Sequence, residues 1–152
     1  MKKLSKYFIT AIVGVLFFGI AYAQFARPEG AIAYRQSVMT IIGYHTAQMG
    51  AIATGKKPYE KKGFSRNAAI VEMLATLPWQ AFMTPGSATG KTEMKPSALN
   101  EKDKFLAKAK VLETETHKLV KAAAGNDFNA VKAQFGNVGK SCKSCHDAYR
   151  SR

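Results

Sequence analysis

Apolar residues recur at helical spacing along most of the chain, and no segment alternates apolar and polar residues as a half-buried strand would. The pattern is clearest between Phe128 and Tyr149, where successive apolar positions are separated by three and four residues in turn. These positions are Phe128, Val131, Phe135, Val138, Cys142, Cys145 and Tyr149. Such a seam is typical of a helix that faces the interior of a bundle, so both cysteines are predicted to point toward the core.

Start and stop signals divide the rest of the chain into three further helices. Pro28 suits the first turn of a helix that should end before Gly55, and Asn126 or Asp127 suits the cap of the last helix. The expected helices cover about 28–55, 65–78, 100–125 and 127–149. Between residues 78 and 100 the chain is rich in proline and glycine, which predicts a long loop without helix. Long helices with mostly short connections predict an all-α fold, an antiparallel four-helix bundle.

The first 23 residues differ from the rest. Lysines at positions 2, 3 and 6 precede an apolar run over residues 7–20, which closes on Ala21-Tyr22-Ala23. This pattern predicts a signal peptide that is cleaved after Ala23, leaving a single domain over residues 24–152 in the periplasm. The alternative is an uncleaved anchor, but the run is shorter than the roughly 20 apolar residues that span a bilayer, so we expect no stable membrane insertion.

Charge adds a constraint on partners. The chain has 152 residues, with 23 Lys and Arg against 10 Asp and Glu, for a formal net charge of +13. Cleavage would remove three lysines and leave +10. An exported protein whose lysines form no block is not expected to bind nucleic acid, and acidic redox proteins are the expected protein partners. We expect no enzyme and no catalytic residues, because neither a Ser-His-Asp set nor paired catalytic carboxylates can be assembled.

Cys142-Lys143-Ser144-Cys145-His146 matches C-x-x-C-H, the attachment sequence of c-type haem. Two thiols three residues apart on a helix lie on one face, so each can add to a vinyl group of one porphyrin edge. His146 follows Cys142 by four residues, about 40° around the helix, so its imidazole can bind the iron axially. The sequence predicts one covalent haem c per chain, with Cys142 and Cys145 as thioether attachments and His146 as iron ligand.

Three other interpretations of this motif are less consistent with the sequence. A thioredoxin-like redox pair needs a strand before it, which this chain lacks. A disulfide between residues three apart would close a very small loop and add little stability. A zinc site would need four ligands, and only His45 and His117 remain as distant candidates.

The chain resembles the cytochromes c′ over essentially its whole mature length. The segments that carry the resemblance are Gln24 to Glu29, Tyr34 to Ser37, Leu77-Pro78-Trp79 with Phe82, and Phe135-Gly136 with Ser141 to Arg150. The resemblance implies a homodimeric four-helix bundle with one covalent haem, a proximal histidine and a distal face closed by apolar side chains. The loop departs from the family pattern, because Ser97-Ala98-Leu99 follows Lys95-Pro96 where an acidic-aliphatic-Trp run is usual.

The resemblance also implies roles for residues outside the attachment motif. Met39 falls on the position over the distal face of the haem, and Arg35 and Gln36 fall on positions that contact its propionates. The alternative for Arg35 and Gln36 is an ordinary solvated helix face. Arg150 matches an arginine beside the proximal side, although a cation at the end of a helix is also favoured by the helix dipole alone.

Thr92 and Glu93 lie in the loop and are further candidates for contact with the haem edge. Met39 leaves two functions open. If its thioether packs as an apolar lid, the iron is five-coordinate and its pocket, with no evident hydrogen-bond donor, should bind nitric oxide and carbon monoxide. If the thioether binds iron, Met39 and His146 make a six-coordinate, low-spin cytochrome that acts purely as an electron carrier.

Overall fold

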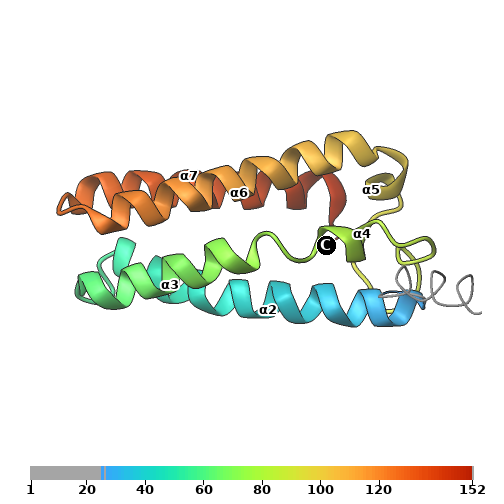
Figure 1. Ribbon diagram of the computed structural model, residues 1–152, viewed down its shortest axis with the longest axis horizontal. Coiled ribbons are helices and arrows are strands. Elements are labelled where there is room, and N and C mark those ends of the chain that lie inside the picture. Colours follow the sequence, from blue (N-terminus) through green and yellow to red (C-terminus); the bar gives the residue numbers. More distant parts are fainter. Residues whose placement is uncertain (1–24, 26, 152) are drawn as a thin grey trace, which may run out of the picture.

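The computed structural model describes residues 25 and 27–151, and these form a four-helix bundle with two short additional helices. The elements are α2 (Pro28–Ala53), α3 (Lys61–Leu74), α4 (Trp79–Phe82), α5 (Ser97–Asn100), α6 (Lys102–Ala124) and α7 (Phe128–Tyr149). Figure 1 shows α2 and α3 side by side in one layer and α6 and α7 in the other, with α4 and α5 together at one end. The predicted fold class is confirmed. The predicted signal peptide, residues 1–23, lies outside the described residues.

Local sequence explains where the long helices begin and end. Pro28 occupies the first turn of α2, as predicted, and Gly55 follows its end with a φ of 75°, which glycine adopts without strain. The carboxylate of Asp127 caps α7 by accepting hydrogen bonds from the N–H groups of Asn129 and Ala130. Both features were readable from the sequence because they depend only on neighbouring residues.

Three predicted helix boundaries differ from the structure. The second long helix begins at Lys61 and not near Ser65, because the carboxylate of Glu60 accepts from the N–H groups of Lys62 and Gly63 and caps an earlier start. It also ends at Leu74, short of the predicted limit at residue 78. The third begins at Lys102, after a separate turn of helix over Ser97–Asn100.

The segment predicted to contain no helix holds α4 and α5. Each follows a proline, Pro78 or Pro96, whose fixed φ favours the start of a helix. Apolar contacts then hold these single turns: Ala81 and Ala98 are fully buried, and both Trp79 and Phe82 pack against Phe105 of α6. Their helicity therefore depends on tertiary packing rather than on local propensity.

The core runs along the middle of the bundle, between the two layers. Its buried apolar residues include Val38, Ile42, Met49, Phe64, Ala68, Val71, Leu112, Leu119, Val131 and Val138. The predicted seam of α7 is confirmed, since each of its seven positions is buried or half-buried. Among the described residues, no helix is both long and apolar enough to cross a membrane.

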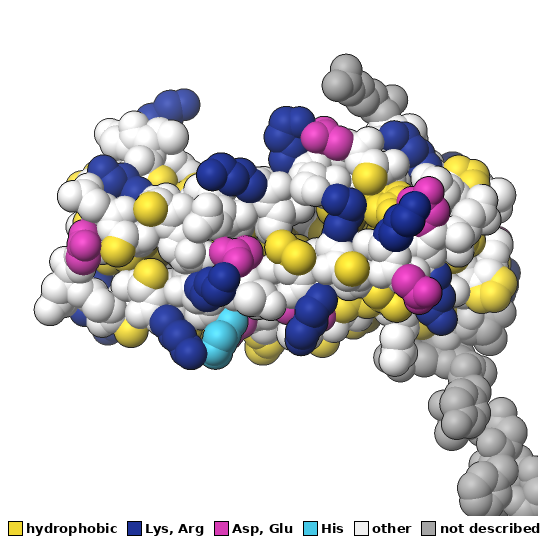
Figure 2. All heavy atoms as spheres, turned by 90° about the horizontal axis from the view of Figure 1, so that it is seen from above, with side chains coloured by type: hydrophobic (Ala, Val, Ile, Leu, Met, Phe, Trp, Pro, Cys, Tyr) yellow, Lys and Arg dark blue, Asp and Glu magenta, His cyan; other side chains and the backbone are white. Residues whose placement is uncertain are grey.

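Charged side chains lie on the outside of the bundle. Figure 2 looks onto the layer formed by α6 and α7, where Lys and Arg are spread along the molecule with Asp and Glu between them. That face carries no single block of basic residues, in agreement with the spacing of lysines in the sequence.

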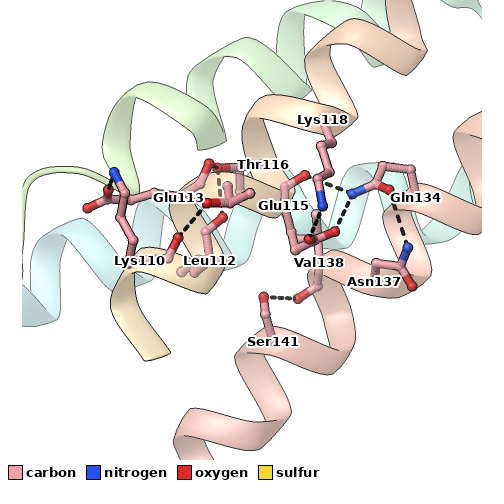
Figure 3. A network of polar contacts seen from close by, with 11 residues as sticks. Lys110, Leu112, Glu113, Glu115, Thr116, Lys118, Gln134, Asn137, Val138 and Ser141 are labelled. Atoms are coloured by element: carbon pink, nitrogen blue, oxygen red, sulfur yellow. Dashed lines mark hydrogen bonds and ion pairs between the residues drawn. The ribbon is translucent and has the colours of Figure 1, made fainter. Parts of the chain in front are cut away.

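A polar network joins α6 to α7 on the edge of this layer (Figure 3). Gln134 donates to the main-chain oxygen of Glu115 at 3.0 Å and to its carboxylate at 2.7 Å, and Lys118 donates to the same carboxylate at 2.8 Å. These bonds lower the pKa of Glu115, the contact with Lys118 having the largest effect. The network fixes how α7, which carries the attachment motif, lies along α6.

Candidate haem-binding site

A large cavity opens between α2, α6, α7 and the loop over residues 90–94, and its volume is about 1290 Å³. Cys142, Cys145 and His146 line one side of it, and Met39 lines it from α2. Gly50 on α2 lies against the ring of Phe135 on α7, and both residues line the cavity. Residues 39 and 146 each lie eleven residues from this contact along their helices, so α2 and α7 run antiparallel along the cavity.

The two cysteines of α7 are half-buried and free, with no disulfide between them. Burial raises the pKa of both thiols, and a lysine near Cys145, Lys108, acts in the opposite direction. A redox pair of the thioredoxin type requires a lowered thiol pKa, so this environment does not favour that interpretation. The described residues bring together no group of three His, Cys, Asp or Glu side chains that could hold a metal ion.

His146 is exposed along the cavity, next to Cys145. Desolvation by the surrounding residues lowers the pKa of its imidazole, the positive charge of Arg150 lowers it further, and Asp147 opposes both. A lowered pKa favours the neutral ring, which is the form that binds a metal. The geometry and the protonation state of His146 therefore both suit an axial ligand.

On α2, Met39 is half-buried and also packs against the main apolar core. Small residues, Gly43, Ala47 and Gly50, continue the same wall. The sequence suggested a pocket without a hydrogen-bond donor, but this wall also carries Thr46. The buried Thr46 hydroxyl has no hydrogen-bond partner in the described residues. Thr46 lies about 10 Å beyond Met39 along the helix, at 1.5 Å per residue.

Arg35 also lines the cavity but is only 2% exposed. Its terminal N–H groups donate to the main-chain oxygens of Ala81 and Ser87, to the Ser87 hydroxyl at 3.0 Å and to the Thr92 hydroxyl at 2.7 Å. Its guanidinium also lies 4.8 Å from the centre of the Phe82 ring. Arg35 therefore does not lie on a solvated helix face, whereas Gln36 is exposed, lines the cavity and donates to Lys91 O at 2.9 Å.

No carboxylate of the described residues pairs with Arg35, and its Nε–H makes no hydrogen bond to them. Burial lowers its pKa, but an arginine remains charged inside a protein. A buried charge without a counter-ion is costly. An anionic group in the cavity would supply that counter-ion, and a haem propionate has the required chemistry.

The loop residues predicted to touch the haem edge bind protein groups in this structure. Thr92 accepts from Arg35, and the Glu93 carboxylate accepts from Arg150 Nε at 2.5 Å. All three predicted loop and proximal residues, Thr92, Glu93 and Arg150, nevertheless line the cavity. The structure brings every predicted site residue to one cavity, and their roles toward a cofactor remain predictions.

An aromatic wall closes the cavity between the loop and α6. Phe105 lies at its centre, with ring centroids 6.1 Å from Trp79, 5.2 Å from Phe82 and 5.3 Å from Tyr149. Phe105 and Lys108 could not be recognised as site residues from the sequence. Helical spacing showed only that Phe105 is buried, and its place on the cavity depends on how α6 packs against the loop.

These features fit a haem attached to the chain. Two free thiols and an imidazole with a lowered pKa share one face of α7, the opposite side is largely apolar, and a buried cation lacks a counter-ion. A flat apolar macrocycle with two acidic substituents matches this combination.

The family described as Cytochrome C' matches residues 30–150. The chain belongs to the cytochrome c′ family. Cytochrome c′ of Alcaligenes xylosoxydans xylosoxydans is 37% identical over 129 residues, which cover 85% of this chain and 99% of that protein. The solved cytochrome c prime from Shewanella frigidimarina is 38% identical, with a TM-score of 0.82 over 84% of this chain and 99% of its own.

Two further solved structures are variants of cytochrome c prime from Alcaligenes xylosoxidans, one a nitric oxide complex and one with carbon monoxide bound. Both are 37% identical to this chain, with TM-scores of 0.77 and 0.78, and they cover 84% of it and 99% of their own chains. Membership of the cytochrome c′ family establishes covalently bound haem c as the cofactor.

Proposed function

We propose that the protein is a periplasmic cytochrome c′ that binds nitric oxide and carbon monoxide at a haem iron with one protein ligand, His146. One observation carries this proposal: the attachment residues of α7 face an apolar wall on α2 that presents Met39 and small side chains. Bound haem supplies an iron with an open coordination position. Gas complexes of the Alcaligenes xylosoxidans variants support the same conclusion.

Different residues of the chain have different roles in binding the cofactor. Cys142 and Cys145 would provide the two thioether attachments, and the imidazole of His146, whose pKa its surroundings lower, would provide the nitrogen ligand of the iron. Arg35 offers its free Nε–H and its charge to a propionate. Met39, on the wall opposite the attachment residues, would exclude water from the open iron position, which would favour uncharged diatomic ligands over anions.

The cleaved signal peptide, the mature domain over residues 24–152 and transfer of electrons to acidic redox proteins are part of the same proposal. Export is supported by the leader sequence, and electron exchange by the formal net charge of +10 that remains after cleavage. We assign no enzymatic activity.

A homodimer through α2 and α3 completes the proposal. Ile41 and Tyr44 on α2, Met73 on α3 and Leu77 just after α3 are exposed large apolar side chains, with exposed fractions of 43–62%. The two helices pack together in one layer, so these side chains offer a second copy an apolar surface.

Absorption spectra of the ferrous protein with and without carbon monoxide test the proposal. An open iron should give a high-spin spectrum that changes on addition of the gas. Met39→Ala should leave the spin state unchanged because the thioether is not a ligand. Low-spin bands that carbon monoxide does not alter, and that Met39→Ala abolishes, would instead establish the six-coordinate electron carrier.

A further inference from the structure

The end of α7 is tied to the loop by a short set of main-chain hydrogen bonds. Lys95 N–H donates to Tyr149 O at 2.9 Å, and both the N–H and the hydroxyl of Ser151 donate to Glu93 O at 2.8 Å. Met94 and Arg150 pair as an isolated antiparallel bridge. We refer to residues 92–95 and 149–151, joined in this way, as the C-terminal clasp.

The clasp lies at the cavity and links its two sides. On the loop side, the Thr92 hydroxyl accepts from Arg35 at 2.7 Å and from Met94 N–H at 3.1 Å, so the loop is anchored to α2. On the α7 side, Arg150 N–H donates to His146 O at 3.0 Å and continues the turn that carries the histidine. A displacement of the clasp would therefore also displace groups around His146, because the two are joined by a short chain segment and by this hydrogen bond.

Within the clasp, one ion pair fixes the long side chain of Arg150. Its Nε donates to Glu93 Oε2 at 2.5 Å, and no other side-chain partner of Arg150 occurs in the described residues. The two side chains are 55% and 60% exposed. A pair this exposed adds only about 0–1 kcal/mol of stability. Its main effect is therefore to set the position of the Arg150 guanidinium.

We propose that Glu93 is a positioning residue, whose carboxylate holds the Arg150 guanidinium in one place beside His146 and so fixes the electrostatic environment of the axial imidazole. This inference rests on the proposed function, in which His146 is the axial ligand. Without the carboxylate, the arginine keeps its charge but distributes it over several rotamers. The field at the histidine then becomes weaker and heterogeneous.

Resonance Raman spectroscopy of the ferrous, haem-loaded protein tests this, because the iron–histidine stretching band reports directly on the axial bond. Glu93→Gln should shift or broaden the band. Arg150→Gln should shift it as well, and the double variant should match Arg150→Gln alone, because Glu93 acts only through Arg150. Glu93→Asp keeps the carboxylate and should restore most of the wild-type band.

Glu29→Gln provides the matched control, because it breaks another exposed carboxylate–arginine pair, the 3.9 Å contact with Arg27, and neither residue lines the cavity that contains His146. That variant should leave the band unchanged. Effects of Glu93→Gln and Arg150→Gln that simply add would overturn the inference, as would an unchanged band with a lowered melting temperature.

The same samples separate this inference from the proposed function. If Glu93→Gln binds carbon monoxide as the wild type does but its band is unchanged, only the positioning role fails. If the wild-type protein shows no iron–histidine band at all, the proposed axial ligation fails.

Discussion

Arg35 is a buried charged residue, and its guanidinium donates all its hydrogen bonds within the described residues to neutral oxygens. Arg35 donates to the main-chain oxygens of Ala81 and Ser87 and so fixes the position of the chain there. It also donates to Thr92, which belongs to the C-terminal clasp. One side chain of α2 thus organises the loop and presents its remaining N–H group to the cavity.

Replacing this arginine by an apolar residue of similar length should be costly. Arg35→Met leaves the oxygens of Ser87 without a donor, and an orphaned buried group of this kind costs about 1–3 kcal/mol. It also removes one of the two donors to Ala81 O and one of the two to the Thr92 hydroxyl. Chemical denaturation of the haem-loaded protein should show a lower free energy of unfolding. Arg66→Met, at an exposed position of α3, is the control. Equal losses in the two variants would show that the buried bonds contribute nothing.

The role of Arg35 toward the loop could not be predicted from the sequence. Its spacing from Met39 placed it on the cavity side of α2, and the resemblance suggested a propionate contact. Its protein partners lie 46 to 57 residues further along the chain, and only the fold brings them together. By contrast, Cys142, Cys145 and His146 could be placed on one face from helix geometry alone, because they lie within about one turn of each other.

At the scale of the elements, the packing of α6 against α7 holds the attachment helix in place. Gln134 and Lys118 converge on the Glu115 carboxylate, and their hydrogen bonds stabilise its charged form. The pKa of this carboxyl in the folded protein therefore lies below its ordinary value of 4.5. The stabilisation is present above that ordinary value and is lost as the pH falls through the lowered pKa.

This gives a pH-dependent prediction for Glu115→Gln. The variant should be less stable than the wild type at neutral pH, and the difference should narrow as the pH falls below 4.5, where the wild-type carboxyl becomes protonated. Thermal unfolding over a pH series measures this. Glu29→Gln, at a carboxylate that is 77% exposed, serves as the control, and its stability should follow the wild type across the series. A constant difference for Glu115→Gln would contradict the argument.

Helix starts that depend on neighbouring residues could be predicted from the sequence, whereas helices that depend on tertiary contacts could not. Asp127 and Pro28 mark helix starts by bonding or shaping their own first turns. The four-residue helices α4 and α5 are too short to show a periodic pattern, and the aromatic contacts with Phe105 that hold α4 come from another part of the chain. The cap at Glu60 was a local signal too, since a glutamate just before a helix can accept from its first N–H groups.

At the scale of the whole molecule, the two layers have different surfaces. The layer of α6 and α7 shows dispersed charge (Figure 2). Of the five large apolar side chains that are exposed among the described residues, α2 and α3 carry three, and a fourth, Leu77, lies just after α3. Apolar side chains exposed together on adjacent helices are typical of an interface. The sequence alone could not locate this surface, because its residues come from two helices and only their packing puts them on one layer.

A charge placed on this surface should separate the proposed dimer. Tyr44 is 62% exposed, so Tyr44→Glu costs the monomer little but buries a carboxylate when two copies meet. Sedimentation analysis should show a dimer for the wild type and a monomer for the variant. Val111→Glu places the same charge at a 51% exposed position of α6 and should remain dimeric. A monomeric wild type would contradict this part of the proposal.

Trp79 is the chain's single tryptophan, and it lies on the wall of the cofactor cavity with its indole N–H bonded to Glu113 at 2.9 Å. Indole emission from this protein therefore originates from one place. The molecule carries an intrinsic optical reporter on the wall of the cavity proposed for its haem, so attachment of haem can be followed in solution without a label.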